Sequence, residues 1–188
     1  GHVHRIASRF DGHYEICAGV FSRNKKKSRK FAQSLGISSD RCYGTFKEMG
    51  SSEKKRKDGI HVVAVMTPPG SHQLISEYFI KKNIHVISDK PFAGNLNQAK
   101  KLYKTIVRNK KIIYGLTHNY SAYPMVRYAK KIVDEKKIGE IEYINVEYVQ
   151  DWSSGKTINS KNAKNIFGWK LDKKIAGTSA VLNEIGSH

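Results

Sequence analysis

Residues 60–91, IHVVAVMTPPGSHQLISEYFIKKNIHVISDKP, decide the fold class of this chain. The run at 60–66 is nearly all apolar and rich in β-branched residues, which is typical of a strand covered on both faces. Ser71 is placed to cap a helix over residues 71–82, and residues 84–88 form a second apolar run. The expected inward face of that helix consists of Leu74, Ile75, Tyr78 and Phe79. Strand, helix and strand in this order predict a parallel βαβ unit.

The same alternation continues on both sides of that unit. Residues 14–21 form a compact apolar run, and the helical pattern that follows is ended by Gly36 in the manner of a C-terminal cap. A helical pattern at 96–108 and a strand pattern at 111–117 follow the second strand. We therefore predict an α/β fold with a doubly wound parallel, Rossmann-like sheet.

A change of pattern marks the start of a second domain. Pro124 opens a helical pattern that runs to Lys137, and polar and apolar residues then alternate over 140–149, EIEYINVEYV. Such alternation is typical of a half-exposed antiparallel strand. We predict one domain over residues 1–120 and, over residues 121–188, the start of an α+β domain with a mainly antiparallel sheet.

The formal net charge of +18 raises nucleic-acid binding as an alternative function. However, the lysines are scattered along the expected helices, where they favour helix and complement the macrodipole, whereas a groove binder pools its charge on one face. No apolar run approaches the ~20 residues that span a bilayer. Cys17 and Cys42 lack a metal or redox spacing. We expect no nucleic-acid or membrane partner, and reduced thiols in a cytoplasmic protein.

The sequence Asp89-Lys90-Pro91 follows the second strand of the βαβ unit directly. Proline lacks a backbone donor and stops a central strand, so it leaves Asp89 and Lys90 at a strand's carboxyl end. Open α/β sheets bind ligands at that edge. The alternative is a surface turn with two solvated charges.

Segments along the whole chain resemble, in order, the Gfo/Idh/MocA family of oxidoreductases, which includes glucose–fructose oxidoreductase and inositol dehydrogenase. They are VVAVMTPPGSH (62–72), HVISDKP (85–91), GLTHNYSAYPMVR (115–127), IGEIEYINVEY (138–148) and AGTSAVLNEIGSH (176–188). The start, GHVHRIA, resembles the end of the family's glycine-rich turn and the beginning of its first helix. The resemblance implies a fragment truncated at both ends, which lacks the first strand of the sheet and most of the second domain.

The resemblance also implies an NAD(P)-dependent oxidoreductase that transfers hydride between nicotinamide and a secondary alcohol of a sugar, cyclitol or related polyol. Lys90 would act as a proton shuttle at the reacting oxygen, His188 as the general base, and Glu184 would orient His188. Two residues depart from the family pattern, with aspartate at 89 for glutamate and glutamate at 184 for aspartate. The family often has a cis peptide before this proline.

The Glu184–His188 spacing has two other interpretations. Residues four apart share one helix face, so the pair also fits a solvated surface pair or half of a zinc site. No third ligand candidate is well placed in the sequence, so we expect no metal.

The resemblance and the residue types together give the expected binding sites. Ser22-Arg23 stand where a dinucleotide enzyme usually places an acid, which favours NADP over NAD, with an ordinary charged turn as the alternative. The expected cofactor-binding residues are Gly1, Ser22, Arg23, Thr67, Pro68, His72, Asp89, Lys90 and Asn119. The expected substrate-binding residues are Lys90, Tyr120 and His188.

The expected partners are a small polyol or sugar and, in the full-length protein, further copies of the chain. A non-catalytic nucleotide-binding regulator or sensor of the same fold is the alternative, and Glu184 in place of aspartate leaves it open.

Overall fold

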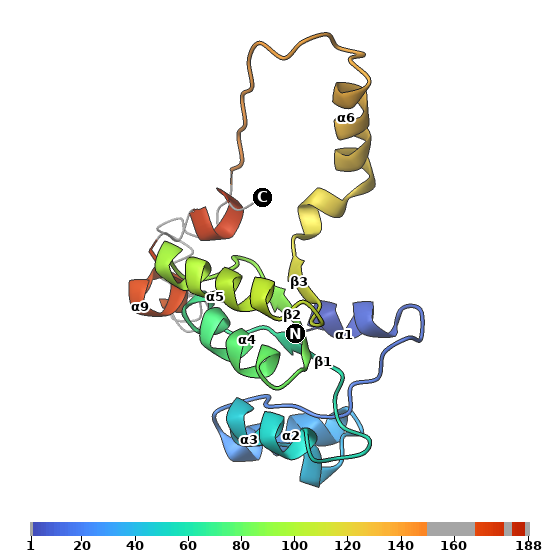
Figure 1. The fold of residues 1–188 in the computed structure, drawn as a ribbon, viewed down its shortest axis with the longest axis vertical. Coiled ribbons are helices and arrows are strands. Elements are labelled where there is room, and N and C mark those ends of the chain that lie inside the picture. Colours follow the sequence, from blue (N-terminus) through green and yellow to red (C-terminus); the bar gives the residue numbers. More distant parts are fainter. Residues whose placement is uncertain (1, 150–167, 179–181, 187–188) are drawn as a thin grey trace.

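The computed structural model describes residues 2–149, 168–178 and 182–186. Among these residues, three strands form one sheet: β1 (Val62–Val65), β2 (His85–Asp89) and β3 (Tyr114–Thr117), in the order β1-β2-β3 (Figure 1). Both neighbouring pairs are parallel. The parallel βαβ prediction and the α/β fold class are therefore confirmed.

The connections between the strands are helical, as parallel pairing requires. Helix α4 (His72–Ile80) joins β1 to β2 after the short 3₁₀ turn η2 (Pro69–Ser71), and α5 (Leu96–Arg108) joins β2 to β3. The other helical elements of the described residues are α1 (His2–Arg9), α2 (Lys25–Ser34), η1 (Ser39–Arg41), α3 (Phe46–Glu53), η3 (Asn119–Ala122), α6 (Pro124–Asp134), η4 (Gly168–Leu171), α9 (Lys173–Ala176) and η5 (Leu182–Gly186).

The core lies between the sheet and α4 and α5. Phe79, Val86 and Leu102 are fully buried there, and Ile75 lies beside Phe79 on the same face of α4. Leu74 is more than half exposed, because it lies about 100° around the helix from Ile75. The expectation that Leu74 faces inward is therefore wrong.

The prediction that Ser71 caps α4 is also wrong. Ser71 already has helical backbone angles within the turn that begins at Pro69, so its side chain does not bond a first-turn N–H of α4. Its hydroxyl lies instead within hydrogen-bond distance of the Pro68 carbonyl and the Thr67 hydroxyl. Ser71 thus tightens the loop that follows β1.

Two expected strands are not formed among the described residues. Over residues 14–21 only Gly19 makes a ladder contact, an isolated parallel bridge to Cys42. Residues 141–149 follow α6 without a partner strand in the described part of the chain, and Figure 1 shows an extended trace that turns back at the far end of α6 and runs down toward the body of the molecule. An apolar pattern is compatible with a strand, but a sheet forms only where a neighbouring strand supplies the hydrogen-bond partners.

A buried charge network supports the region before β1. The Arg41 guanidinium donates to both carboxylate oxygens of Glu53, at 3.1 and 2.5 Å, and Glu53 is only 1% exposed. The Tyr43 hydroxyl donates to the same carboxylate at 2.8 Å. Burial, together with this bond, raises the pKa of Tyr43 to about 12. The carboxylate is therefore fully paired.

Every helix in the described residues is too short or too polar to span a lipid bilayer.

Candidate functional site

A cavity of about 430 Å³ lies at the carboxyl ends of β1 and β2. Its wall is formed by the loop after β1, the turn after β2, and the segments 168–178 and 182–186 near the end of the chain. The lining residues are Met66, Thr67, Pro68, Pro69, Asp89, Lys90, Pro91, Trp169, Lys170, Ala176 and Glu184. This is the edge where open α/β sheets bind ligands, and the volume is typical of a small-molecule site.

The two loops from the sheet owe their course to proline. Pro68 and Pro69 follow β1, and Pro91 follows β2, so the backbone cannot continue the ladder at either place. The Lys90–Pro91 peptide is cis, as the family resemblance suggested. Lys90 follows the last residue of β2 directly and lines the cavity.

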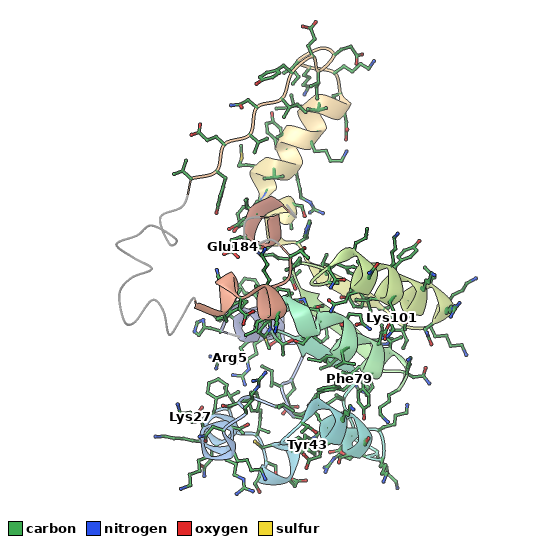
Figure 2. The ribbon with its side chains drawn as sticks, turned by 90° about the vertical axis from the view of Figure 1, so that its left-hand side faces the viewer. Arg5, Lys27, Tyr43, Phe79, Lys101 and Glu184 are labelled. Carbon is green, nitrogen blue, oxygen red and sulfur yellow. The ribbon has the colours of Figure 1, made fainter. Side chains whose placement is uncertain are left out.

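Lys90 meets Glu184 across 94 positions of sequence. Its Nζ donates to the Glu184 backbone carbonyl at 2.5 Å and lies 3.5 Å from Oε2 of the carboxylate. Lys170 Nζ donates to the other carboxylate oxygen, Oε1, at 2.7 Å. Figure 2 shows Glu184 on η5, in the middle of the molecule between α6 and the helices of the sheet. One partly buried carboxylate therefore lies between two ammonium groups.

The environment of Glu184 keeps its carboxylate charged. Burial on its own raises the pKa of this group, but the hydrogen bond from Lys170 and the positive charge of Lys90 outweigh burial and hold the pKa below its ordinary value. An ionised carboxylate accepts protons and orients cations, so the trio can hold an ammonium near a substrate oxygen.

Asp89 is paired with a residue from the first helix. His4 Nε2 lies 2.6 Å from Asp89 Oδ1. Burial on its own raises the pKa of Asp89. The hydrogen bond to His4 and the charges of His4 and His72 outweigh burial, so the pKa lies below its ordinary value. The carboxylate therefore has a fixed orientation beside Lys90.

His72 lies beneath the cavity instead of on its surface. Its side chain is fully buried, with Nδ1 2.8 Å from the Pro91 carbonyl and Nε2 2.5 Å from the Thr67 carbonyl. Both ring nitrogens therefore face backbone oxygens, which corrects the expectation that the imidazole contacts a cofactor. His72 ties the loop after β1 to the turn after β2.

The remaining predicted residues that the structure describes lie outside the cavity lining. Arg23 is exposed, and the Ser22 hydroxyl accepts a hydrogen bond from the Asn24 backbone at 3.1 Å. Asn119 is exposed on η3, and the Tyr120 hydroxyl lies 3.3 Å from that of Tyr148. Gly1 and His188 lie outside the described residues.

Sequence reasoning missed Lys170, its neighbour Trp169, and His4. The lysine runs along the helices are interpreted as solvated charges, and Lys170, which stands outside those runs, pairs with Glu184. A usable signal was the position of Trp169-Lys170 just before the glycine-led segment at 176–188. His4 stands at the start of α1, which a dinucleotide fold places at the carboxyl edge of the sheet.

The segment that carries Lys170 is seated on two glycines of the sheet loops. A Cβ on Gly70 would lie 2.9 Å from the Ile175 carbonyl oxygen and 3.0 Å from that of Lys174. The Thr178 backbone N–H donates to the Gly94 carbonyl at 3.2 Å. Main chain packs on main chain here, which only glycine allows.

No group of three or more His, Cys, Asp or Glu side chains within residues 2–149, 168–178 and 182–186 is arranged to hold a metal ion.

Comparison with known proteins bears on this site. Residues 2–118 match the Gfo/Idh/MocA pattern, described as an oxidoreductase family with an NAD-binding Rossmann fold. An uncharacterized oxidoreductase, YfiI, of Bacillus subtilis strain 168 is 29% identical over 189 residues, which cover 100% of this chain and 47% of that protein. The chain therefore spans about half the length of this relative.

Solved structures show the same fold. The crystal structure of an inositol dehydrogenase homolog complexed with NAD+ from Azotobacter vinelandii superposes with a TM-score of 0.90 at 28% identity, covering 98% of this chain and 46% of that one. A levoglucosan dehydrogenase in complex with NADH and levoglucosan gives a TM-score of 0.72 at 27% identity, covering 87% of this chain and 40% of that one.

Proposed function

Because this chain belongs to the Gfo/Idh/MocA oxidoreductase family, we propose that the full-length protein transfers hydride between a nicotinamide cofactor and a secondary alcohol of a sugar, cyclitol or related polyol. The observation that carries the proposal is the meeting of Lys90 and Glu184 in a cavity at the carboxyl edge of the sheet. The inositol and levoglucosan named for the structural neighbours set the substrate class to test first.

The residues at this edge fit a nicotinamide cofactor. Thr67 and Pro68 line the cavity from the loop after β1. Asp89 bonds His4 through Oδ1, and its second carboxylate oxygen suits a ribose hydroxyl. When bound, NAD(P) would supply the hydride chemistry at its C4 atom. The protein supplies orientation and proton transfer.

Lys90 is proposed to hold the proton at the reacting oxygen. Its ammonium is a charge-assisted donor, and the sheet turn on one side and Glu184 on the other fix its position. Tyr120, whose ring lies 5.4 Å from that of Tyr123, is proposed to contact the substrate beside it. His188 is proposed as the general base that takes the hydroxyl proton, with Glu184 as its orienting acid.

For the cofactor, we propose NADP in preference to NAD. The support is the absence of an acid at Ser22-Arg23 and the exposure of the Arg23 guanidinium, which can pair with a 2′-phosphate. We further propose that residues 1–120 form the dinucleotide-binding domain and residues 121–188 begin the substrate and dimerisation domain of a cytoplasmic homo-oligomer. Support for an interface is the exposure of Tyr143 and Val146, at 82% and 83%.

The test compares Lys90→Met with wild type in the full-length protein, using a panel of polyols and sugars with both cofactors. We expect kcat to fall by ~10²–10⁴-fold, as is usual for a general acid–base group, with little change in cofactor affinity. Lys101→Met is the matched control, since Lys101 lies on α5 away from the cavity (Figure 2). Full turnover by Lys90→Met would refute the proposal, whereas cofactor binding without turnover in wild type would support the non-catalytic alternative.

A further inference from the structure

We infer that Lys170 is a positioning residue of the site, one that acts on Lys90 through Glu184; the inference rests on the proposed function. Lys170 is a cavity-lining side chain, and its Nζ makes a direct ion pair with Glu184.

The geometry divides the carboxylate between the two lysines. Lys170 takes Oε1 at 2.7 Å, while Lys90 stands 3.5 Å from Oε2 and makes its short contact with the backbone carbonyl. The stronger side-chain pair is therefore the one with Lys170. Without Lys170, the carboxylate can turn both oxygens onto Lys90 and draw that ammonium away from a substrate oxygen.

The backbone around Lys170 is built to hold it in place. Asp172 caps α9 by accepting a hydrogen bond from the Lys174 N–H at 2.9 Å. The carbonyls of Lys174 and Ile175 then pack against Gly70. Because only Asp172 separates η4 from this seated helix, Lys170 projects from an anchored segment, so its ion pair orders the side chain with little further cost in backbone entropy.

The other lysines of the segment do not share this environment. Lys173 and Lys174 are exposed on α9, whereas the Lys170 side chain is 20% exposed. Lys173 therefore offers a matched control with the same change of charge, three residues along the same backbone.

The electrostatic consequence has a definite sign. The hydrogen bond from Lys170 is the foremost of the interactions that hold the pKa of Glu184 down against burial. Removing it raises the pKa of Glu184, so a larger fraction of Glu184 is protonated at mildly acid pH. The acid limb of the pH–rate profile then moves to higher pH, which a purely structural role of Lys170 would not cause.

The test uses full-length Lys170→Met, Lys170→Arg and Lys173→Met. We expect Lys170→Met to lower kcat by about ten- to a hundredfold, the range of one charge-assisted hydrogen bond, with cofactor affinity retained and the acid limb shifted upward. Lys170→Arg keeps the ion pair and should recover most of the rate, and Lys173→Met should match wild type.

A double mutant isolates the route of action. In a Glu184→Gln background, Lys170→Met should cause little further loss, because its effect passes through that carboxylate.

A second readout needs no turnover. In the cofactor-free protein, the depressed pKa of Glu184 makes the pair stabilising above the unfolded-state value and lost as pH falls through the lower folded-state value. The Tm gap between wild type and Lys170→Met should therefore close in acid.

Three results would overturn the inference: a Lys170→Met enzyme that behaves like Lys173→Met, an equal loss in the Glu184→Gln background, or a Tm gap independent of pH. Inactive wild type would instead refute the proposed function.

Discussion

We expect Gly70→Ala to push α9 off the loop that follows β1. The new Cβ would lie 2.9 Å from the Ile175 oxygen and 3.0 Å from the Lys174 oxygen, both of them backbone atoms that cannot rotate away. Gly70 is not among the glycines with positive φ, so the substitution adds contacts without straining its own backbone. The change in stability and rate therefore reports on the packing of α9 against Gly70.

The size of the effect follows from these distances. Ordinary contact begins at 3.4 Å, so α9 must retreat by ~0.5 Å, and overpacking of this kind costs ~1–3 kcal/mol. Lys170 lies in η4, three residues before α9 begins, so we expect a shift of α9 to displace it. Since a ~1 Å misplacement in a site can cost ~10²-fold in rate, we expect kcat to fall about tenfold.

The assay pairs steady-state kinetics with urea unfolding of the full-length protein. Gly115→Ala is the control, because its Cβ would meet only Ile87 at an ordinary 3.7 Å. A wild-type kcat together with an unchanged free energy of unfolding for Gly70→Ala would refute the idea that the packing of α9 on Gly70 positions Lys170.

Two further predictions address the buried network and the cofactor. Glu53→Ala leaves the buried Arg41 guanidinium without its main acid and should cost ~3–5 kcal/mol in chemical denaturation. Asp40→Ala breaks the exposed Asp40–Arg56 pair and should cost far less, because solvent screens that pair; equal losses would contradict the burial argument. Arg23→Ala should weaken NADP binding by about ten- to a hundredfold more than NAD binding, measured by fluorescence titration, and equal weakening would show that Arg23 does not read the 2′-phosphate.

The parallel sheet could be predicted because its signals are local. Apolar runs near 60–66, 84–88 and 111–117, each ended by proline, glycine or polar residues, define strands without knowledge of distant contacts. Lys90 could be placed at the carboxyl edge for the same reason, since Pro91 ends β2 beside it.

The rest of the site depends on contacts between distant segments. The His4–Asp89 pair spans 85 positions and the Lys90–Glu184 pair spans 94, and no helical or strand period relates such residues. The family resemblance implies that His72 lines the cofactor, but the burial of its side chain depends on the packing of the turn after β2, which no local pattern shows. The runs at 14–21 and 140–149 show the same limit for strands, which need a partner as well as a pattern.

The extended stretch at 141–149, which has no partner strand among the described residues, has a consequence for the colloidal behaviour of this chain. A long extended segment with alternating apolar side chains, not joined to a sheet within the described part of the chain, is a template on which a second chain can add edge to edge, the first step of aggregation. The net charge of +18 opposes that step by mutual repulsion between molecules. Since added salt screens such repulsion over ~10 Å at 0.1 M, the solubility of the 188-residue chain should fall as ionic strength rises.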